Sequence, residues 1–273
     1  MTKTVFIDFD GTFADRGLVP PGHFEAVHRA RENGHRVFLC TGRPKISVPA
    51  EALGSLFDGV VCTAGGYVEI KERVLSDVRF PPELAARTLA ELLAHDAAFL
   101  LEAPQALFST DSGLERIRKL YGRALWAADP EMGLEGFLAN IHTPDDLSTC
   151  SFSKVVVVDS PVPVTELAEA IGPEVGALPD SVTGRSGSGG ELYQLGVDKS
   201  AGIAVVEAHL GLRRRDIIAI GDGTNDIEML AYAGLGIAVE GSPPEVLAVA
   251  QRTIPGPAVE GVAQAFAELG LTR

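Results

Sequence analysis

Two acidic motifs carry the residue types that could do catalysis in this chain. Asp8-Phe9-Asp10-Gly11-Thr12 directly follows an apolar run, and Gly221-Asp222-Gly223-Thr224-Asn225-Asp226 follows another. Residues two apart on a strand point to the same side, so the two carboxylates of the first motif are expected to face one pocket. The two carboxylates of the second motif lie four apart at the start of an expected helix, where both can approach a common point. The spacing therefore predicts a pocket lined by four carboxylates.

Such a pocket requires positive charge. Two like charges about 4 Å apart repel by about 4 kcal/mol at an effective dielectric constant of about 20. Lys199 is expected to supply one cation, because it enters a predicted helix after Gly196-Val197-Asp198. Mg²⁺ suits the remaining charge, since it prefers a few carboxylates, retained waters and phosphate oxygens. Zinc is not favoured, because no His or Cys residue is placed to bind it.

A third motif, Thr41-Gly42-Arg43, ends a further apolar run. It offers a hydroxyl group and backbone N–H groups that suit an oxyanion. Alone, the motif at Asp8, the motif at Thr41 and Lys199 are weak signals, because acidic turns and solvated lysines are common, whereas the Gly221-to-Asp226 motif is a stronger one. A calcium loop is disfavoured, since the EF-hand spacing with its closing Glu is absent. All of the motifs in this order, each at the junction of a strand and a helix, favour one catalytic site.

The segments that position these motifs alternate between apolar strands and helices. Strands are expected over residues 4–9, 36–40, 59–62, 217–220 and 235–239, with helices between Pro20 and Gly34, over 201–210 and over 227–233, and a hairpin around Lys71-Glu72. This alternation predicts an α/β fold with a parallel sheet and helices on both faces. Open parallel sheets place their sites at the carboxyl ends of the strands, which is where the motifs lie.

Residues 83–189 differ in character and are predicted to form an inserted α+β domain, which leaves residues 1–82 and 190–273 as the catalytic core. The expected elements of the insertion are helices over 83–95, 114–121, 134–141 and 164–171, and strands near 99–101, 107–108 and 154–158. The stretch Gly184–Gly190 is interpreted as a hinge or linker. A nucleotide-binding loop is disfavoured there, because the stretch lacks the Lys-Ser/Thr pair of a P-loop and follows no clear strand.

Composition and charge argue against several classes of protein. The 273 residues are 46% apolar, which allows a substantial core. The net charge of −14 argues against a nucleic-acid partner. No apolar run approaches the roughly 20 residues of a membrane helix, and the start Met-Thr-Lys-Thr lacks a signal-peptide pattern, so we expect a cytoplasmic protein without a membrane partner. Cys40, Cys62 and Cys150 are too scattered for a disulfide framework and are expected to be packing residues; no oligomeric state is predicted.

Together these features resemble the haloacid dehalogenase (HAD) superfamily, and within it the Cof-type, subclass IIB hydrolases that are similar to sugar phosphatases. The family's four motifs would be Asp8–Thr12, Thr41, Lys199 and Asp222–Asp226, and the resemblance covers essentially the whole chain. The ending Glu260-Gly261-Val262-Ala263 is also similar. The resemblance implies a Rossmann-like three-layer core with a parallel sheet, and an inserted α+β cap domain of the C2B type that reads the leaving group.

The resemblance also implies a Mg²⁺-dependent phosphatase for a small phosphorylated metabolite, with a sugar phosphate as the first expectation. Asp8 would be the nucleophile that forms an aspartyl phosphate, and Asp10 would be the general acid and base. Mg²⁺ would be bound by the Asp8 carboxylate, the Asp10 backbone carbonyl and Asp222, with Asp226 close behind. The residues expected to hold or contact the phosphorylated substrate are Gly11, Thr41, Gly42, Arg43, Lys199 and Asn225.

Two departures from the family pattern bear on the substrate. Ala64-Gly65-Gly66 stands where relatives often have Asn-Gly-Ala, which removes a usual polar contact, and Glu240-Gly241-Ser242-Pro243 replaces Met-Gly-Asn-Ala. Two other functions stay open. A phosphomutase of the phosphomannomutase type would share the capped architecture. A catalytically inactive ligand-binding protein would share the fold, although the intact set of acids with Lys199 argues against it.

Two weaker candidates lie in the inserted domain. A basic stretch could contact an anionic substrate, although a solvated helix face is favoured. It consists of Arg116, Arg118, Lys119 and Arg123. His142 could also touch the substrate, but a loop histidine with local hydrogen bonds is the favoured interpretation.

Overall fold

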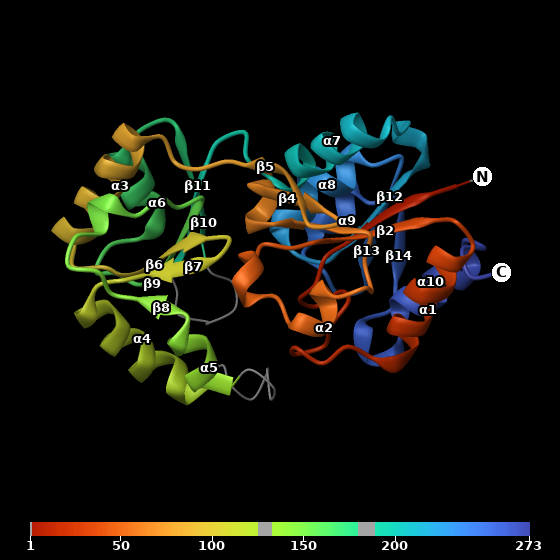
Figure 1. Cartoon of the computed structure of the whole chain (residues 1–273), viewed down its shortest axis with the longest axis horizontal. Helices are drawn as coiled ribbons and strands as arrows, with labels where there is room; N and C mark the ends of the chain where they lie inside the picture. The colour runs from red at the N-terminus through yellow and green to blue at the C-terminus, as the bar shows by residue number, and fades with distance from the viewer. Residues whose placement is uncertain (1, 125–132, 180–188) are drawn as a thin grey trace. The chain divides into compact units, whose positions relative to one another are not determined.

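A computed structural model describes residues 2–124, 133–179 and 189–273 of the chain (Figure 1). This part of the chain separates into two compact units, each with its own sheet. Unit 1 comprises Met1–Arg43, Val48–Ser76 and Asp198–Arg273, and unit 2 comprises Pro44–Ser47 and Asp77–Val197.

Unit 1 is built on a mostly parallel sheet. Within the described residues this sheet has eight strands in the order β14-β13-β12-β1-β2-β3-β4-β5. The strands from β14 to β3 in that order run parallel, and β4 pairs antiparallel with β3. Their bounds are β1 Thr4–Ile7, β2 Arg36–Cys40, β3 Gly59–Cys62, β4 Tyr67–Ile70, β5 Arg73–Asp77, β12 Ile217–Gly221, β13 Leu235–Val239 and β14 Arg252–Ile254. The parallel pairing brings the carboxyl ends of β1, β2 and β12 to one edge.

Helices cover both faces of this sheet, as strand β1 shows. Val5 packs in one apolar cluster with Val27 of α1 and Phe266 of α10, whereas Phe6 packs in a second cluster with Ile203 of α7. Although they lie near opposite ends of the chain, α1 and α10 are side by side (Figure 1). The helices of unit 1 are α1 Pro21–Glu32, α2 Ala50–Leu53, α7 Lys199–Leu210, α8 Ile227–Tyr232, α9 Pro244–Val249 and α10 Gly261–Glu268. The predicted α/β class with a three-layer core is confirmed.

Unit 2 is an α+β structure with a mainly antiparallel sheet. Its described strands follow the order β10-β11-β9-β6-β7-β8. Leu92 of α3 and Leu167 of α6 pack with Phe99 on one face of this sheet. On the other face, Leu100 packs with Ile117 of α4. Alternate residues of strand β6 therefore enter different apolar clusters, as the two-residue repeat of a strand requires.

The remaining elements complete the two units. Those of unit 2 are α3 Pro82–Ala94, β6 Ala98–Ala103, β7 Ala106–Phe108, α4 Asp111–Ala124, α5 Gly133–Ala139, β8 Ile141–His142, β9 Lys154–Asp159, α6 Val164–Ile171, β10 Val175–Pro179 and β11 Gly190–Gln194. The 3₁₀ helices are η1 Lys45–Ser47, η2 Thr63–Gly65, η3 Leu147–Thr149, η4 Arg214–Asp216, η5 Thr224–Asp226 and η6 Pro257–Val259. No helix in the described parts of the chain is both long and apolar enough to span a membrane.

Several predicted elements differ from those observed. Strand β1 ends at Ile7, two residues before its predicted end. The helix predicted over 134–141 ends at Ala139, because Ile141–His142 instead pairs with β7 as a parallel strand. Strands β10, β11 and β14 and helix α9 were not predicted, since they are short and lack a clear apolar period.

The prediction that Gly184–Gly190 is a linker is wrong for its last residue. Residues 184–188 lie outside the described residues. Gly190 opens β11 and lies opposite Pro179 in the antiparallel pairing with β10. This end of the stretch is therefore held in a sheet by backbone hydrogen bonds, and the stretch does follow a strand.

Candidate functional site

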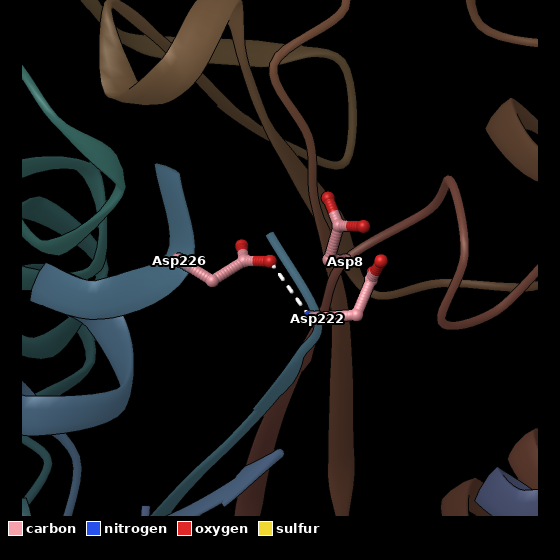
Figure 2. Close-up of side chains that lie close together, drawn as sticks. All are labelled: Asp8, Asp222 and Asp226. Carbon is pink, nitrogen blue, oxygen red and sulfur yellow. Dashed lines mark hydrogen bonds between the residues drawn. The ribbon is translucent and has the colours of Figure 1, made fainter. Parts of the chain in front are cut away.

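Three carboxylates meet at the carboxyl edge of the unit 1 sheet. Asp8 follows β1, Asp222 follows β12, and Asp226 ends the 3₁₀ helix η5. One carboxylate oxygen from each lies within 4.8 Å of the others. Figure 2 shows the carboxylates of Asp8 and Asp222 side by side, with that of Asp226 directed toward them. Because β1 and β12 are parallel neighbours, the residues just past their ends are brought together.

Lys199 joins two of these acids from inside the protein. Its Nζ donates to Asp8 Oδ1 at 2.6 Å and to Asp226 Oδ1 at 2.5 Å, and its side chain is fully buried. Lys199 is the first residue of α7, whose N-terminus is capped by the Asp198 carboxylate accepting from the Ala201 N–H at 3.0 Å. Burial lowers the pKa of Lys199, but the two carboxylates outweigh this effect and raise it above its ordinary value. The ammonium group therefore stays charged.

One lysine leaves this cluster with surplus negative charge. Burial raises the pKa of Asp8 well above its ordinary value; Lys199 opposes the rise, whereas Asp226 and Asp222 add to it. Burial also raises the pKa of Asp222 to about 6, against the lowering effect of a hydrogen bond from Thr12. An all-oxygen donor set with excess negative charge fits Mg²⁺, which prefers a few carboxylates together with waters and phosphate oxygens.

Two residues of the first motif fit closely around Asp222. The Thr12 hydroxyl donates to Asp222 Oδ1 at 2.6 Å. Gly11 has a φ of +83°, and a Cβ atom at this position would lie 2.3 Å from Asp222 Oδ2. The contact of Gly11 with substrate stays a prediction; in the protein itself, Asp222 is what leaves no room for a side chain at this position. No separate role was predicted for Thr12, although its place in the motif was a signal.

Asp226 organises the loop that carries Asp222. Its Oδ2 accepts from the N–H groups of Asp222 and Gly223, both at 2.9 Å, while Oδ1 accepts from Lys199. Both oxygens therefore have protein donors. Asn225, predicted to contact the phosphoryl group, lies beside Asp226 in η5 and is half-buried.

The Asp10 carboxylate is paired with an arginine beside the three-acid cluster, and its charge adds to the raised pKa of Asp8 and of Asp222. Strand β1 ends at Ile7, so Asp8 and Asp10 lie past its end and the alternation expected within a strand does not apply to them. The Asp10 carboxylate instead receives two hydrogen bonds from Arg43, at 2.7 Å from Nε and 2.6 Å from Nη2. Of the four carboxylates predicted to converge, those of Asp8, Asp222 and Asp226 form one cluster, in which Lys199 binds Asp8 and Asp226. The fourth, that of Asp10, is paired with Arg43 beside this cluster.

The loop after β2 is fixed by a strained turn that sequence analysis missed. Thr63, Ala64 and Gly65 have φ values of 51°, 49° and 100°, in a region that residues other than glycine rarely adopt. The Ala64 N–H donates to the Thr41 carbonyl at 3.1 Å, and the Thr63 N–H donates to the Arg43 carbonyl at 2.8 Å. These bonds place Thr41, Gly42 and Arg43 next to the strained turn.

Thr63 also carries a polar group that no sequence signal revealed. Its side chain is buried, and Thr63 Oγ1 has no hydrogen-bond partner within the described residues. The neighbouring residues Cys40 and Cys62 are buried in the two apolar clusters of unit 1, as expected for packing residues. Burial raises the pKa of the Cys40 thiol, which keeps it protonated.

The weaker candidates of unit 2 make local contacts. Arg116 forms ion pairs with Asp96 and Asp159, so its positive charge has acidic partners within unit 2. The side chain of Arg123 lies outside the described residues. The carbonyl of His142 accepts from the Ser109 N–H at 3.0 Å, and its ring lies 6.0 Å from that of Phe108. His142 is therefore in a strand and not in the loop that was expected.

Two curated relatives from Bacillus subtilis (strain 168) are similar to the chain along its whole length. YxeH, provisionally named a phosphatase, is 26% identical over 279 residues, covering 100% of both chains. YkrA, named in the same way, is 26% identical over 282 residues, covering 100% of this chain and 99% of the relative.

A solved structure and a family model are also similar to the chain over most of its length. A solved structure described as the HAD subclass IIB sugar phosphatase BT4131 has a TM-score of 0.79 and 22% identity, covering 99% of this chain and 100% of that chain. The family model for haloacid dehalogenase-like hydrolases matches residues 5–266, which contain all of the acidic and basic residues described above. The chain belongs to the haloacid dehalogenase-like hydrolase family and is an enzyme of that class.

Proposed function

We propose that this enzyme is a Mg²⁺-dependent phosphatase that hydrolyses a small phosphorylated metabolite, with sugar phosphates as the first class to test. The observation that carries the proposal is the buried contact of Lys199 with Asp8 and Asp226, with Asp222 completing the acidic cluster. Family membership and the phosphatase names of the relatives support the same reaction. That the protein is cytoplasmic stays a prediction.

The acidic cluster would hold the metal ion. The proposed ligands are the carboxylates of Asp8 and Asp222 and the backbone carbonyl of Asp10, with Asp226 behind them. When bound, Mg²⁺ supplies positive charge to the cluster and to the phosphoryl oxygens. Asp226 binds two backbone N–H groups and Lys199, so its role is to hold Asp222 and Lys199 in place.

The reaction would proceed in two steps at Asp8. A carboxylate oxygen of Asp8 attacks phosphorus, and the bond from phosphorus to the leaving oxygen breaks with its electron pair passing to that oxygen. Asp10 gives its proton to the leaving oxygen. Water then attacks phosphorus, Asp10 takes a proton from that water, and the Asp8 carboxylate is released with inorganic phosphate. Lys199 favours the ionised form of Asp8 that the first step requires.

The remaining polar groups of unit 1 would bind the substrate. Lys199 and the loop Thr41–Gly42 are the proposed partners of the phosphoryl oxygens, together with Gly11, Arg43 and Asn225. Unit 2 is proposed to be the cap domain that recognises the leaving group. The stretch Ala64-Gly65-Gly66 offers no polar side chain to the substrate, and whether this alters the substrate preference is a question for a substrate screen.

The test is replacement of the proposed nucleophile. Asp8→Asn should reduce release of phosphate from p-nitrophenyl phosphate by more than about 1,000-fold, because the amide cannot form the phosphoenzyme. Full activity of this variant would disprove the proposal. Phosphate release from sugar monophosphates, without a bisphosphate activator, separates hydrolysis from the phosphomutase alternative, in which an isomer would form instead.

A further inference from the structure

Arg43 and Asp10 form a two-pronged ion pair beside the acidic cluster. Arg43 Nε lies 2.7 Å from Asp10 Oδ2, and Nη2 lies 2.6 Å from Oδ1. Such parallel contacts orient the carboxylate as well as pairing its charge. The Asp10 side chain is 51% exposed, so solvent and ligands can reach it.

Arg43 is itself held in place by unit 1. Its guanidinium carbon lies 5.0 Å from the ring centroid of the fully buried Phe9, within the range of a cation–π contact. Its backbone N–H donates to Thr41 Oγ1 at 3.1 Å, and its carbonyl accepts from the Thr63 N–H at 2.8 Å. The Arg43 side chain packs on Phe9 and the Arg43 backbone is hydrogen-bonded to Thr41 and Thr63. These contacts hold the Arg43–Asp10 pair in place, unlike an exposed ion pair between two mobile side chains.

We propose that Arg43 is a positioning residue for Asp10, and that this role, more than binding of the phosphoryl group, determines how well the enzyme expels poor leaving groups. The inference rests on the proposed function. When Asp10 gives its proton to the leaving oxygen, the negative charge that forms on its carboxylate lies against the Arg43 guanidinium. Two of the guanidinium nitrogens are directed at Asp10, which leaves fewer donors for a phosphoryl group.

The chemistry of the leaving group distinguishes the two roles. An aryl oxygen such as that of p-nitrophenyl phosphate leaves readily as an anion, whereas the alkoxide of an alkyl phosphate needs a proton from the acid. The ratio kcat/KM covers the steps up to loss of the leaving group, so it isolates this transfer from the later attack of water. Loss of a positioned general acid costs about 100-fold to 10,000-fold when the leaving group needs its proton.

The experiment compares p-nitrophenyl phosphate with glycerol 3-phosphate in the full chain with Mg²⁺. Arg43→Gln should lower kcat/KM for both substrates, with a loss at least about tenfold larger for the alkyl phosphate. Arg43→Lys keeps the charge but not the two-pronged geometry. It should also lower kcat/KM more for the alkyl phosphate than for the aryl phosphate, and it replaces the Gln variant if that variant does not fold. Arg213→Gln, which breaks an Arg–Asp216 pair elsewhere in unit 1, is the control and should leave the substrate ratio unchanged.

A second measurement tests the coupling to Asp10 directly. In an Asp10→Asn background, Arg43→Gln should have less than about a threefold further effect on kcat/KM, because residues that act as a unit are not additive. Equal losses for the two substrates, together with weaker inhibition by inorganic phosphate, would assign Arg43 to phosphoryl binding and overturn the inference. The proposed function is judged separately, by whether Asp8→Asn abolishes the wild-type activity.

Discussion

Lys199 Nζ lies 2.6 Å from Asp8 Oδ1, in a contact where the lysine side chain is fully buried. The two residues are 191 positions apart in the chain, and β1 and α7 bring them together. A buried charge needs a partner, because removing an ion from water costs several kcal/mol. The contact therefore links the stability of unit 1 to the chemistry proposed for Asp8.

Lys199→Met should lower both stability and activity. The change leaves Asp8 and Asp226 without their shared cation, and breaking a buried pair in this way costs about 3 to 5 kcal/mol. Denaturant unfolding should show this loss, and phosphate release should fall by more than about 100-fold. Lys154→Met is a matched control, because Lys154 is also buried and pairs with Glu102 and Glu191 in unit 2.

The control should lose stability but keep measurable turnover of p-nitrophenyl phosphate. Comparable activity losses in the two variants would show that unfolding, and not the loss of charge beside Asp8, explains the effect of Lys199→Met.

Gly11→Ala should disturb the site because it adds a Cβ atom next to the Asp222 carboxylate. The new Cβ would lie 2.3 Å from Asp222 Oδ2, so the carboxylate must move. Gly34→Ala is the control: Gly34 has the same φ of +83°, but a Cβ there would meet nothing within 4 Å. Both variants carry the backbone cost of a left-handed residue, about 1 to 2 kcal/mol.

Only Gly11→Ala should raise the Mg²⁺ concentration needed for half-maximal activity and lower kcat, each by about tenfold or more. Equal Mg²⁺ titrations for the two variants would contradict the assignment of Asp222 as a metal ligand.

Stabilisation by Mg²⁺ should increase with pH. Burial raises the pKa of Asp222 to about 6 from an ordinary value of 3.8. In the metal-free protein, the stability that this group contributes is fully present below pH 3.8 and is lost as the pH rises through about 6. Mg²⁺ binds the ionised carboxylate, so its effect on the melting temperature should be larger at about pH 7.5 than at about pH 5.

Thermal unfolding with EDTA and with excess Mg²⁺ measures this difference. Thr12→Val removes the hydrogen bond that lowers the pKa of Asp222. The stabilising effect of Mg²⁺ should therefore appear at a higher pH in this variant than in the wild type. A melting-temperature increase that is the same at both pH values would rule out Asp222 as the titrating ligand.

His23 should make unit 1 less stable in mild acid. Its Nε2 accepts from the Val262 N–H at 3.2 Å, so the other nitrogen carries the proton and donates to the Phe13 carbonyl at 2.8 Å. Burial lowers the pKa of His23 below its ordinary value of 6.5. The stability contributed by this neutral ring is present above pH 6.5 and is lost as the pH falls through the lowered pKa.

His23→Gln keeps a donor and an acceptor but cannot titrate in this range. The free energy of unfolding should therefore fall more steeply in the wild type than in the variant between about pH 7 and about pH 5. Parallel curves would show that His23 does not cause the pH dependence.

The class of fold and the position of the candidate site could both be predicted from the sequence. Apolar runs such as Val5–Ile7 and Ile217–Ile220 predicted buried parallel strands, because only strands covered on both faces are apolar throughout. The polar residues that follow them had to meet at one edge of the sheet. Asp8, Lys199, Asp222 and Asp226 could therefore be grouped before their distances were known.

The tertiary structure decided which partner each side chain takes. Strand alternation placed Asp10 with Asp8, but the strand ends at Ile7, and Arg43 from the next loop binds the Asp10 carboxylate. The close fit of Gly11 to Asp222 joins segments more than two hundred residues apart in the chain. Local patterns follow from apolar period and backbone preference, whereas partners beyond the strand ends depend on how distant loops pack, and the sequence near each loop does not specify that packing.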